Sequence, residues 1–184
     1  YTVQWKDTIH NTTTAYKTKI RNIELSRNWL EINVSSPGSL GVEVLRQVNV
    51  LNDVELIKIK GVLNDADWTT IGQMNNVVGI DLSETSITTI PNEAFSGLTL
   101  LTDVKLPETL TSIGEYAFTG CTSLKSIKLP DSVTEIGGCA FIGCTSLSDV
   151  KLSEKLISIG DNAFNGCVAL TDITIPPSVT KMGD

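Results

Sequence analysis

Apolar side chains recur along most of this chain with a period of 23 residues, except that the step from Val77 to Leu101 is one residue longer. They form triplets with the spacing L-x-x-L-x-L, and the last part of each triplet alternates apolar and polar residues. Such alternation predicts a short strand with one buried face. The six triplets are Val54-Ile57-Ile59, Val77-Ile80-Leu82, Leu101-Val104-Leu106, Leu124-Ile127-Leu129, Leu147-Val150-Leu152 and Leu170-Ile173-Ile175. The pattern therefore predicts six strands in one repeating register.

A second set of positions repeats with the same period between the triplets. Phenylalanine stands at 95, 118, 141 and 164, which is a 23-residue period, with alanine directly before it and glycine two positions after it. The full units are 87–109, 110–132, 133–155 and 156–178, and 179–184 begins a fifth. A constant period of this length is typical of a solenoid, in which each unit buries its apolar face only by stacking on its neighbours.

Glycine and proline columns indicate where each unit bends. Gly97 and its equivalents up to Gly166, and the column of Gly114, Gly137 and Gly160, suit positions that need a positive φ or a close approach of two backbones. Prolines stand just past the strands at 107, 130 and 176, where a missing N–H ends strand pairing. Each unit is thus expected to be a strand, a bend, a return segment and a second bend.

The period fails before Val54, so the N-terminal part is treated separately. Alternating residues over 1–35 predict a small β-rich extension, which leans on the solenoid, completes a preceding domain or swaps with a partner. Leu40, Val44, Leu45 and Val48 follow helical spacing, which predicts an N-terminal helical cap over 36–53. A second short helix is expected from Asp65 or Asp67 onward, through Trp68, Ile71 and Met74. The solenoid then occupies 54–184 and is truncated in its last repeat.

The stretches Leu110 to Pro130 and Val133 to Leu147 resemble BspA-type leucine-rich repeats. The resemblance is strong over 87–184 and weak over 54–86. It implies an α/β-type repeat solenoid, built as a right-handed arc with the triplet strands in a parallel sheet on the concave side. Because this family is found on surface and secreted proteins of gut and oral bacteria and of some protozoan parasites, the resemblance also implies adhesion, or other protein and glycan contacts, outside the cell.

Charge and hydropathy argue against two kinds of partner, nucleic acids and the interior of a membrane. The chain carries a net charge of −7 and has a pI near 4.7, which argues against a nucleic-acid surface. The longest apolar runs are far below the roughly 20 residues that cross a bilayer, so no membrane span is expected. No signal peptide opens the chain and Tyr1 is not an initiator methionine, so we expect a processed or recombinant piece of a longer extracellular protein.

Three of the four cysteines share one repeat column. Cys121, Cys144 and Cys167 follow Leu98 in that column, which predicts buried thiols in an apolar slot. The distance between adjacent rungs permits a disulfide, but parallel side-chain directions make its torsion awkward. Cys139 belongs to a different column and is expected to be more exposed. It is therefore the better candidate for a reactive thiol, one without a functional role.

Catalytic and metal chemistry have little support in the sequence. Cysteines that lie a full repeat apart lack the short chelating pairs of zinc modules, and the one histidine, His10, lies far from them. No nucleophile elbow, zinc-protease motif or phosphate-binding glycine loop is present. The chain is therefore predicted to be non-enzymatic, with no metal and no cofactor.

The residues between the core positions of each triplet are the candidate contacts, because they point away from the core. One column reads Lys58, Asp81, Lys105, Lys128, Lys151 and Thr174, and its neighbour reads Leu56, Gly79, Asp103, Ser126, Asp149 and Asp172. These columns are either a solubilising ladder of mixed charge or a ligand-binding strip. The predicted strip consists of Lys105, Lys128, Lys151, Asp103, Asp149 and Asp172. The columns contain no aromatic cluster that would favour stacking on sugar rings.

The sequence favours a non-catalytic extracellular binding or adhesion module for a protein or glycan ligand. Two alternatives are a structural spacer that displays other domains of a larger surface protein, and an ancillary domain of a secreted hydrolase. The identity of the ligand, the face that binds it and the oligomeric state are left open by the sequence.

Overall fold

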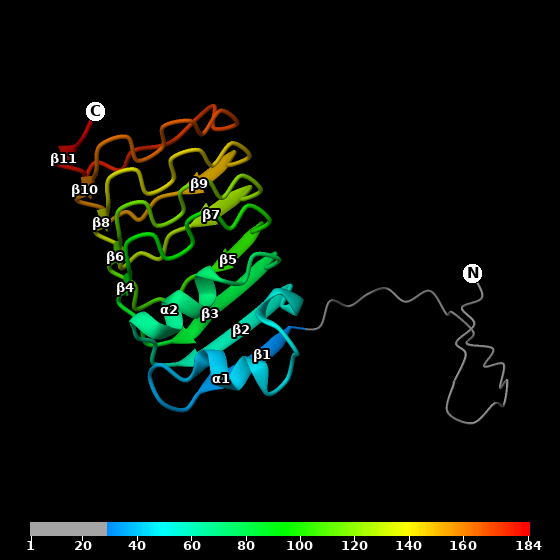
Figure 1. The fold of residues 1–184 in the computed structure, drawn as a ribbon. Helices are drawn as coiled ribbons and strands as arrows, with labels where there is room; N and C mark the ends of the chain where they lie inside the picture. The colour runs from blue at the N-terminus through cyan, green and yellow to red at the C-terminus, as the bar shows by residue number, and fades with distance from the viewer. Residues whose placement is uncertain (1–28) are drawn as a thin grey trace, which may run out of the picture.

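The computed structural model describes residues 29–184, which stack as the turns of a solenoid (Figure 1). Its strands fall into two ladders of parallel strands, one on either side of the core. The first, which we call the triplet ladder, contains β1 (Leu30–Val34), β2 (Leu56–Gly61), β3 (Gly79–Thr85), β5 (Asp103–Lys105), β7 (Ser126–Lys128) and β9 (Asp149–Lys151). The second ladder contains β4 (Thr89–Ile90), β6 (Ser112–Ile113), β8 (Glu135–Ile136), β10 (Ser158–Ile159) and β11 (Lys181–Met182).

The triplet ladder follows the register that the sequence predicts. Equivalent core residues of neighbouring strands lie opposite one another, as Ile57 does to Ile80 and Ile80 to Val104. Strand pairing is interrupted once, between β5 and β7, which remain in contact. Five of the six predicted triplets form strands. The sixth prediction was wrong, because residues 171–176 adopt no regular structure. No main-chain hydrogen bond joins residues 171–176 to the neighbouring strand β9, so the ladder of pairing does not extend to this segment.

The second ladder was not predicted as strands. Its members are very short, and their register repeats the period of the chain, as in Ile113 opposite Ile136. Such short segments give no periodic signal of their own, since a pair of residues cannot show alternation. They pair because the stack holds equivalent residues of adjacent turns side by side.

The first strand of the triplet ladder comes from the predicted N-terminal extension. β1 runs parallel to β2, with Leu30 opposite Ile57 and Ile32 opposite Ile59. Ile32 and Val34 are buried in the solenoid core. The step from Leu30 to Ile57 is longer than the period, so the period does not reveal this strand. The division into 1–35, 36–53 and 54–184 stays a prediction, and the other strands expected in the extension lie outside the described residues.

Helices take the place of second-ladder strands in the first two turns. α1 (Leu40–Leu45) and the 3₁₀ turn η1 (Leu51–Asp53) connect β1 to β2, and α2 (Asp65–Gly72) follows β2. Both predicted helices are therefore present. The side chain of Asn64 caps α2 by accepting hydrogen bonds from the N–H groups of Ala66 and Asp67.

A stack of phenylalanine rings runs through the core. The ring centroids of Phe95 and Phe118 lie 4.8 Å apart, and the stack continues to Phe141 and Phe164 at 5.1 and 5.3 Å. Beside it, the thiols of Cys121, Cys144 and Cys167 donate hydrogen bonds to main-chain carbonyls at 3.1 to 3.2 Å. The prediction that these three thiols are buried is confirmed.

The glycine columns serve the two purposes that the sequence suggests. Gly97 and its equivalents adopt φ values between 67° and 76°. A Cβ atom on Gly137 would lie 2.7 Å from backbone atoms of the preceding turn, so that column is glycine because adjacent turns approach closely. A column that the sequence does not mark is Glu93, Tyr116, Cys139 and Asn162, whose φ values of 54° to 60° are unusual for residues with side chains.

No helix within residues 29–184 combines the length and the apolar character that a membrane span requires.

Candidate binding face of the triplet ladder

The solvent-facing side of the triplet ladder, called the triplet face below, carries the predicted strip. Alternation along β5, β7 and β9 turns Val104, Ile127 and Val150 toward the core and leaves the residues on either side exposed. Five of the six predicted strip residues lie on these strands. The sixth, Asp172, is exposed but lies on the segment that forms no strand.

Lysines at the β1 end of the triplet face have carboxylate partners. Lys60 lies 3.1 Å from Glu84 and 3.3 Å from Glu31, and Lys58 also pairs with Glu84. The hydrogen bonds from Lys58 and Lys60 lower the pKa of Glu84, and Glu84 raises the pKa of both lysines. This group of charges is neutralised within the protein.

A bulge in β3 places Glu84 in this network. Register is regular up to Lys58 opposite Asp81, and then shifts so that Lys60 faces Glu84. β3 contains one additional residue at this point, which also accounts for the longer step from Val77 to Leu101 in the sequence. The sequence shows the longer step but not which side chain it brings to the lysines.

The charge of Lys105 is also engaged. Its ammonium lies 3.5 Å from a carboxylate oxygen of Asp81, on the neighbouring strand. Burial opposes ionisation of Asp81, but hydrogen bonds from the hydroxyl and N–H of Ser83 and the charge of Lys105 outweigh it and lower the Asp81 pKa. Asp81 is therefore a buried carboxylate with its partners in place.

An aromatic side chain that lies outside the predicted columns completes this end of the face. Trp29, directly before β1, places its ring centre 5.4 Å from the ammonium of Lys105. A Cβ atom built on Gly79 would come within 3.1 Å of the Trp29 ring and 2.7 Å of the Leu56 side chain. Trp29 therefore lies against the bare backbone of β3. The signal in the sequence was the absent side chain at Gly79, in a column otherwise occupied by larger residues.

The β7–β9 end of the triplet face differs in its charge pairing. Lys128 lies directly opposite Lys151, and Ser126 lies opposite Asp149. Among residues 29–184, no carboxylate approaches within 4.0 Å of the ammonium of either lysine. Of the three lysines in the predicted strip, Lys105 is thus paired within the protein, and the other two have no carboxylate partner in the described chain.

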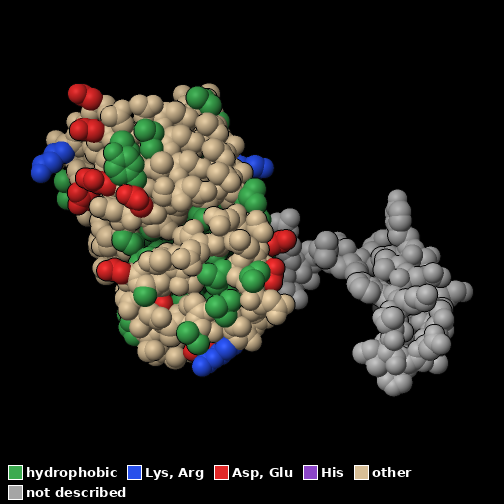
Figure 2. Space-filling view, viewed as in Figure 1, with side chains coloured by type: hydrophobic (Ala, Val, Ile, Leu, Met, Phe, Trp, Pro, Cys, Tyr) green, Lys and Arg blue, Asp and Glu red, His purple; other side chains and the backbone are tan. Residues whose placement is uncertain are grey.

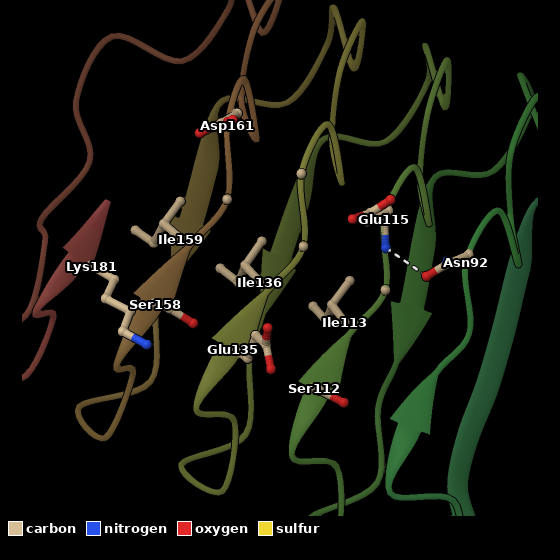
Figure 3. A pocket seen from close by; sticks show the side chains of 14 residues that line it. Asn92, Ser112, Ile113, Glu115, Glu135, Ile136, Ser158, Ile159, Asp161 and Lys181 are labelled. Atoms are coloured by element: carbon tan, nitrogen blue, oxygen red, sulfur yellow. Dashed lines mark hydrogen bonds between the residues drawn. The ribbon is translucent and has the colours of Figure 1, made fainter. Parts of the chain in front are cut away.

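A pocket of about 670 Å³ lies on the other side of the solenoid, over the second ladder (Figure 3). Its lining includes the closely packed backbone at Gly114, Gly137 and Gly160, together with Glu135 on β8 and the loop residue Asp161. Its residues also include Asn92, Ser112, Glu115, Ser158 and Lys181. The Asn92 side chain accepts a hydrogen bond from the N–H of Glu115 at 2.9 Å. No pattern in the sequence indicates this pocket.

The space-filling view shows carboxylates gathered toward the end of the molecule that carries β10 and β11 (Figure 2). The pocket of the second ladder shares this character, since Glu115, Glu135 and Asp161 contribute carboxylates to it and Lys181 one ammonium. No group of three or more histidine, cysteine or acidic side chains within residues 29–184 is placed to hold a metal ion.

The cysteines divide into two chemical environments. Burial raises the pKa of Cys121 to about 12, and a hydrogen bond with Cys167 together with burial raises the pKa of Cys144. Cys139 is half-buried, as predicted, and a hydrogen bond with its thiol raises the pKa of Tyr116 in the preceding turn. All four thiols are free.

The sequence of residues 73–184 matches the description "BspA type leucine rich repeat region" in six copies. The chain belongs to the BspA-type leucine-rich repeat family. Leucine-rich repeat proteins generally mediate protein binding, and members of this kind are typically non-catalytic.

Solved structures of two bacterial leucine-rich repeat proteins share the fold, and a third shows a weaker likeness. A leucine-rich repeat protein from Bacteroides ovatus is 36% identical, with a TM-score of 0.53, over 64% of this chain and 30% of that one. The leucine rich repeat protein of T. pallidum is 24% identical, with a TM-score of 0.57, over 84% of this chain and 69% of that one. A leucine rich cell surface protein from Faecalibacterium prausnitzii is 20% identical, with a TM-score of 0.43, over 74% and 55% of the two chains. This chain thus spans less than a third of the length of the B. ovatus protein. A comparison with curated protein sequences finds no match.

Proposed function

We propose that the chain is an extracellular binding module whose triplet face contacts a protein or glycan partner. The observation that carries this proposal is the exposure of charged side chains on three consecutive strands, β5, β7 and β9, over a continuous buried core. A row of short parallel strands presents these side chains at intervals of about 4.8 Å, which suits contact with an extended surface better than chemistry at one point. Adhesion outside the cell is part of the proposal and is supported by the family resemblance.

The proposal includes the curvature and the cap. We propose that the array curves as a right-handed arc with the triplet face on the concave side, and that residues 36–53 cap its N-terminal end. The buried side chains of Leu40 and Val44, which join α1 to the core, support the capping role. A polar cover at a solenoid end prevents apolar core from meeting water.

The test is a binding screen of the full chain against arrays of secreted and cell-surface proteins and of glycans. We expect at least one ligand whose binding weakens when Asp103→Lys and Lys105→Glu are introduced together on β5. The matched control is Glu135→Lys with Lys181→Glu on the second ladder, which reverses two charges on the opposite side. Binding lost only in the control would place the partner on the second ladder, and no ligand on any array would contradict the proposed binding function.

A structural spacer is the second candidate, and the phenylalanine stack favours it. Ring contacts of 4.8 to 5.3 Å join consecutive turns, so the array resists bending between them. A spacer would bind nothing on the arrays, and removal of one repeat unit from the longer protein would reduce display of its other domains. The third alternative, an ancillary domain of a secreted hydrolase, stays a prediction that the sequence of the whole protein would test.

A further inference from the structure

Charge pairing on the triplet face changes abruptly between β5 and β7. On the β1 side of this boundary, Lys58 and Lys60 share Glu84, and Lys105 pairs with Asp81. Each of these lysines therefore meets a carboxylate from its own chain. An external anion would compete with those carboxylates for contact with the lysines.

Beyond the boundary, the two lysines face each other. Lys128 and Lys151 occupy directly opposite positions on β7 and β9, and both are exposed. Like charges in this arrangement destabilise the pairing of neighbouring strands. Since no carboxylate of the described chain lies within 4.0 Å of either ammonium, the countercharge is missing here. A partner that brings a carboxylate to this position would relieve the repulsion.

The neighbouring positions indicate what else such a partner carries. Asp149 and Ser126 lie opposite each other beside the lysines, and Asp172 and Thr174 are exposed in the next turn. This part of the face therefore presents two cations flanked by carboxylates and hydroxyls. A partner of the two lysines must place its carboxylates between them and keep clear of Asp149 and Asp172, which a short peptide segment does more readily than a long, uniformly anionic glycan.

The lack of aromatic residues on β7 and β9 also favours a protein partner over a glycan. β7 and β9 contain no aromatic residue, and Trp29 lies at the other end of the face, against Gly79 and Lys105. Stacking on a sugar ring needs an aromatic surface beside the polar groups. The β7–β9 end does not provide one.

We infer that the β7–β9 end of the triplet face binds an acidic protein segment, whose carboxylates lie between Lys128 and Lys151. This inference rests on the proposed binding function and adds the location and the chemistry of the partner. Lys105, although part of the predicted strip, is already paired with Asp81, so its ammonium is less available to the carboxylates of a partner than those of Lys128 and Lys151.

The test is a titration of the full chain with a hexaglutamate peptide, followed through the backbone amide signals in NMR spectra at low salt. We expect shifts concentrated on β7 and β9 that disappear as salt is added, because exposed charge contacts are screened. Replacing Lys128→Glu and Lys151→Glu together should weaken binding about tenfold or more, since each contact turns from attraction to repulsion. The matched control, Lys125→Glu with Lys155→Glu, makes the same change of net charge at exposed positions outside these strands and should bind within about twofold of the parent.

Three outcomes would overturn the inference: no shifts on β7 and β9 at millimolar peptide, equal weakening in the control variant, or shifts on these strands with chondroitin sulfate but not with hexaglutamate. Circular dichroism of each variant establishes that it is folded. A ligand from the arrays that binds the Lys128→Glu, Lys151→Glu variant as tightly as the parent would overturn this inference and leave the proposed binding function intact.

Discussion

The indole of Trp68 meets the ring of Phe95 edge-on, with centroids 5.7 Å apart and planes at 85°. Trp68 lies on α2, in a turn that has no phenylalanine, and its ring occupies the end of the stack formed by Phe95 and its equivalents. The repeat core and the helical first turns thus form one aromatic cluster. Edge-to-face contact of this kind stabilises a ring pair beyond the area that it buries.

Replacing Trp68→Ala should therefore destabilise the whole array. The side chain is buried, so its removal leaves a cavity against Phe95, and we expect a loss of about 3–5 kcal/mol in the free energy of unfolding. Trp68→Phe should cost less because a ring remains. Urea denaturation followed by circular dichroism measures both. Equal, small losses for the two variants would show that the ring contact does not couple the helical turns to the stack.

Asp67 holds the two helical turns together through main-chain contacts. Its buried carboxylate accepts hydrogen bonds from the N–H groups of Gly38, Leu40 and Asn64 at 2.7, 2.9 and 3.0 Å. Asp67→Ala leaves these donors without their partner, so we expect a loss of at least about 2 kcal/mol. Asp65→Ala is the matched control, since it removes an exposed carboxylate from the same helical turn. Similar unfolding midpoints for the two variants would contradict the role given to Asp67.

A substitution at Gly137 would test whether the close packing of adjacent turns requires glycine. A Cβ atom there would lie 2.7 Å from the N atom of Glu115 and from the carbonyl carbon of Gly114, and backbone atoms cannot move aside without shifting the turn. We expect Gly137→Ala to lower the thermal midpoint by several degrees, which corresponds to about 1–3 kcal/mol. Gly72→Ala, where nothing lies within 4 Å, should be neutral or slightly stabilising. Differential scanning calorimetry compares the two, and a tolerated Gly137→Ala would mean that the turns can separate.

The rate of reaction with a thiol reagent should distinguish Cys139 from the three buried cysteines. Because burial raises the pKa of Cys121 to about 12, its thiol stays protonated and unreactive in mildly alkaline buffer. Reaction of the native chain with a thiol reagent such as DTNB should label Cys139 first, and urea should release the other three. Cys139→Ser should remove the fast phase. A fast phase that survives this substitution would mean that the buried column opens to solvent.

Asp81 should contribute to stability in a defined range of pH. Its pKa is lower in the folded chain than in the unfolded one, so its contribution is present above the unfolded pKa and is lost as pH falls through the folded pKa. We expect Asp81→Asn to reduce the acid dependence of unfolding below about pH 4 by less than about 1 kcal/mol. Urea midpoints in acidic and neutral buffer measure this difference, with Asp103→Asn, an exposed aspartate on the same face, as the control. An equal change in the two variants would remove Asp81 from this role.

Much of the fold follows from the repeat, and the exceptions are segments that the repeat pattern does not mark. Five triplets became strands, and the glycine and cysteine columns have the environments that the sequence predicts. β1 lies within the predicted β-rich extension, but the sequence does not place it beside β2, because the step from Leu30 to Ile57 exceeds the period. The strands of the second ladder are too short for any sequence pattern.

The sequence predicts that the residues of the proposed strip are exposed, but it does not predict how their charges pair. Exposure of Lys105, Lys128 and Lys151 follows from alternation, which a strand imposes on any sequence. Their charge pairing does not follow from it. Lys105 meets Asp81 and Trp29, whereas Lys128 meets Lys151, although all three lysines occupy the same repeat column.

By itself, the sequence determined the period, the register and the identity of most core residues. Each turn must present the same apolar positions to its neighbours, so the packing requirement is repeated in the chain and can be read from it. Only the tertiary structure decided which surface charges are neutralised. That outcome depends on residues outside the period, such as Trp29 before β1 and Glu84 after the bulge, and their positions are set by contacts between turns.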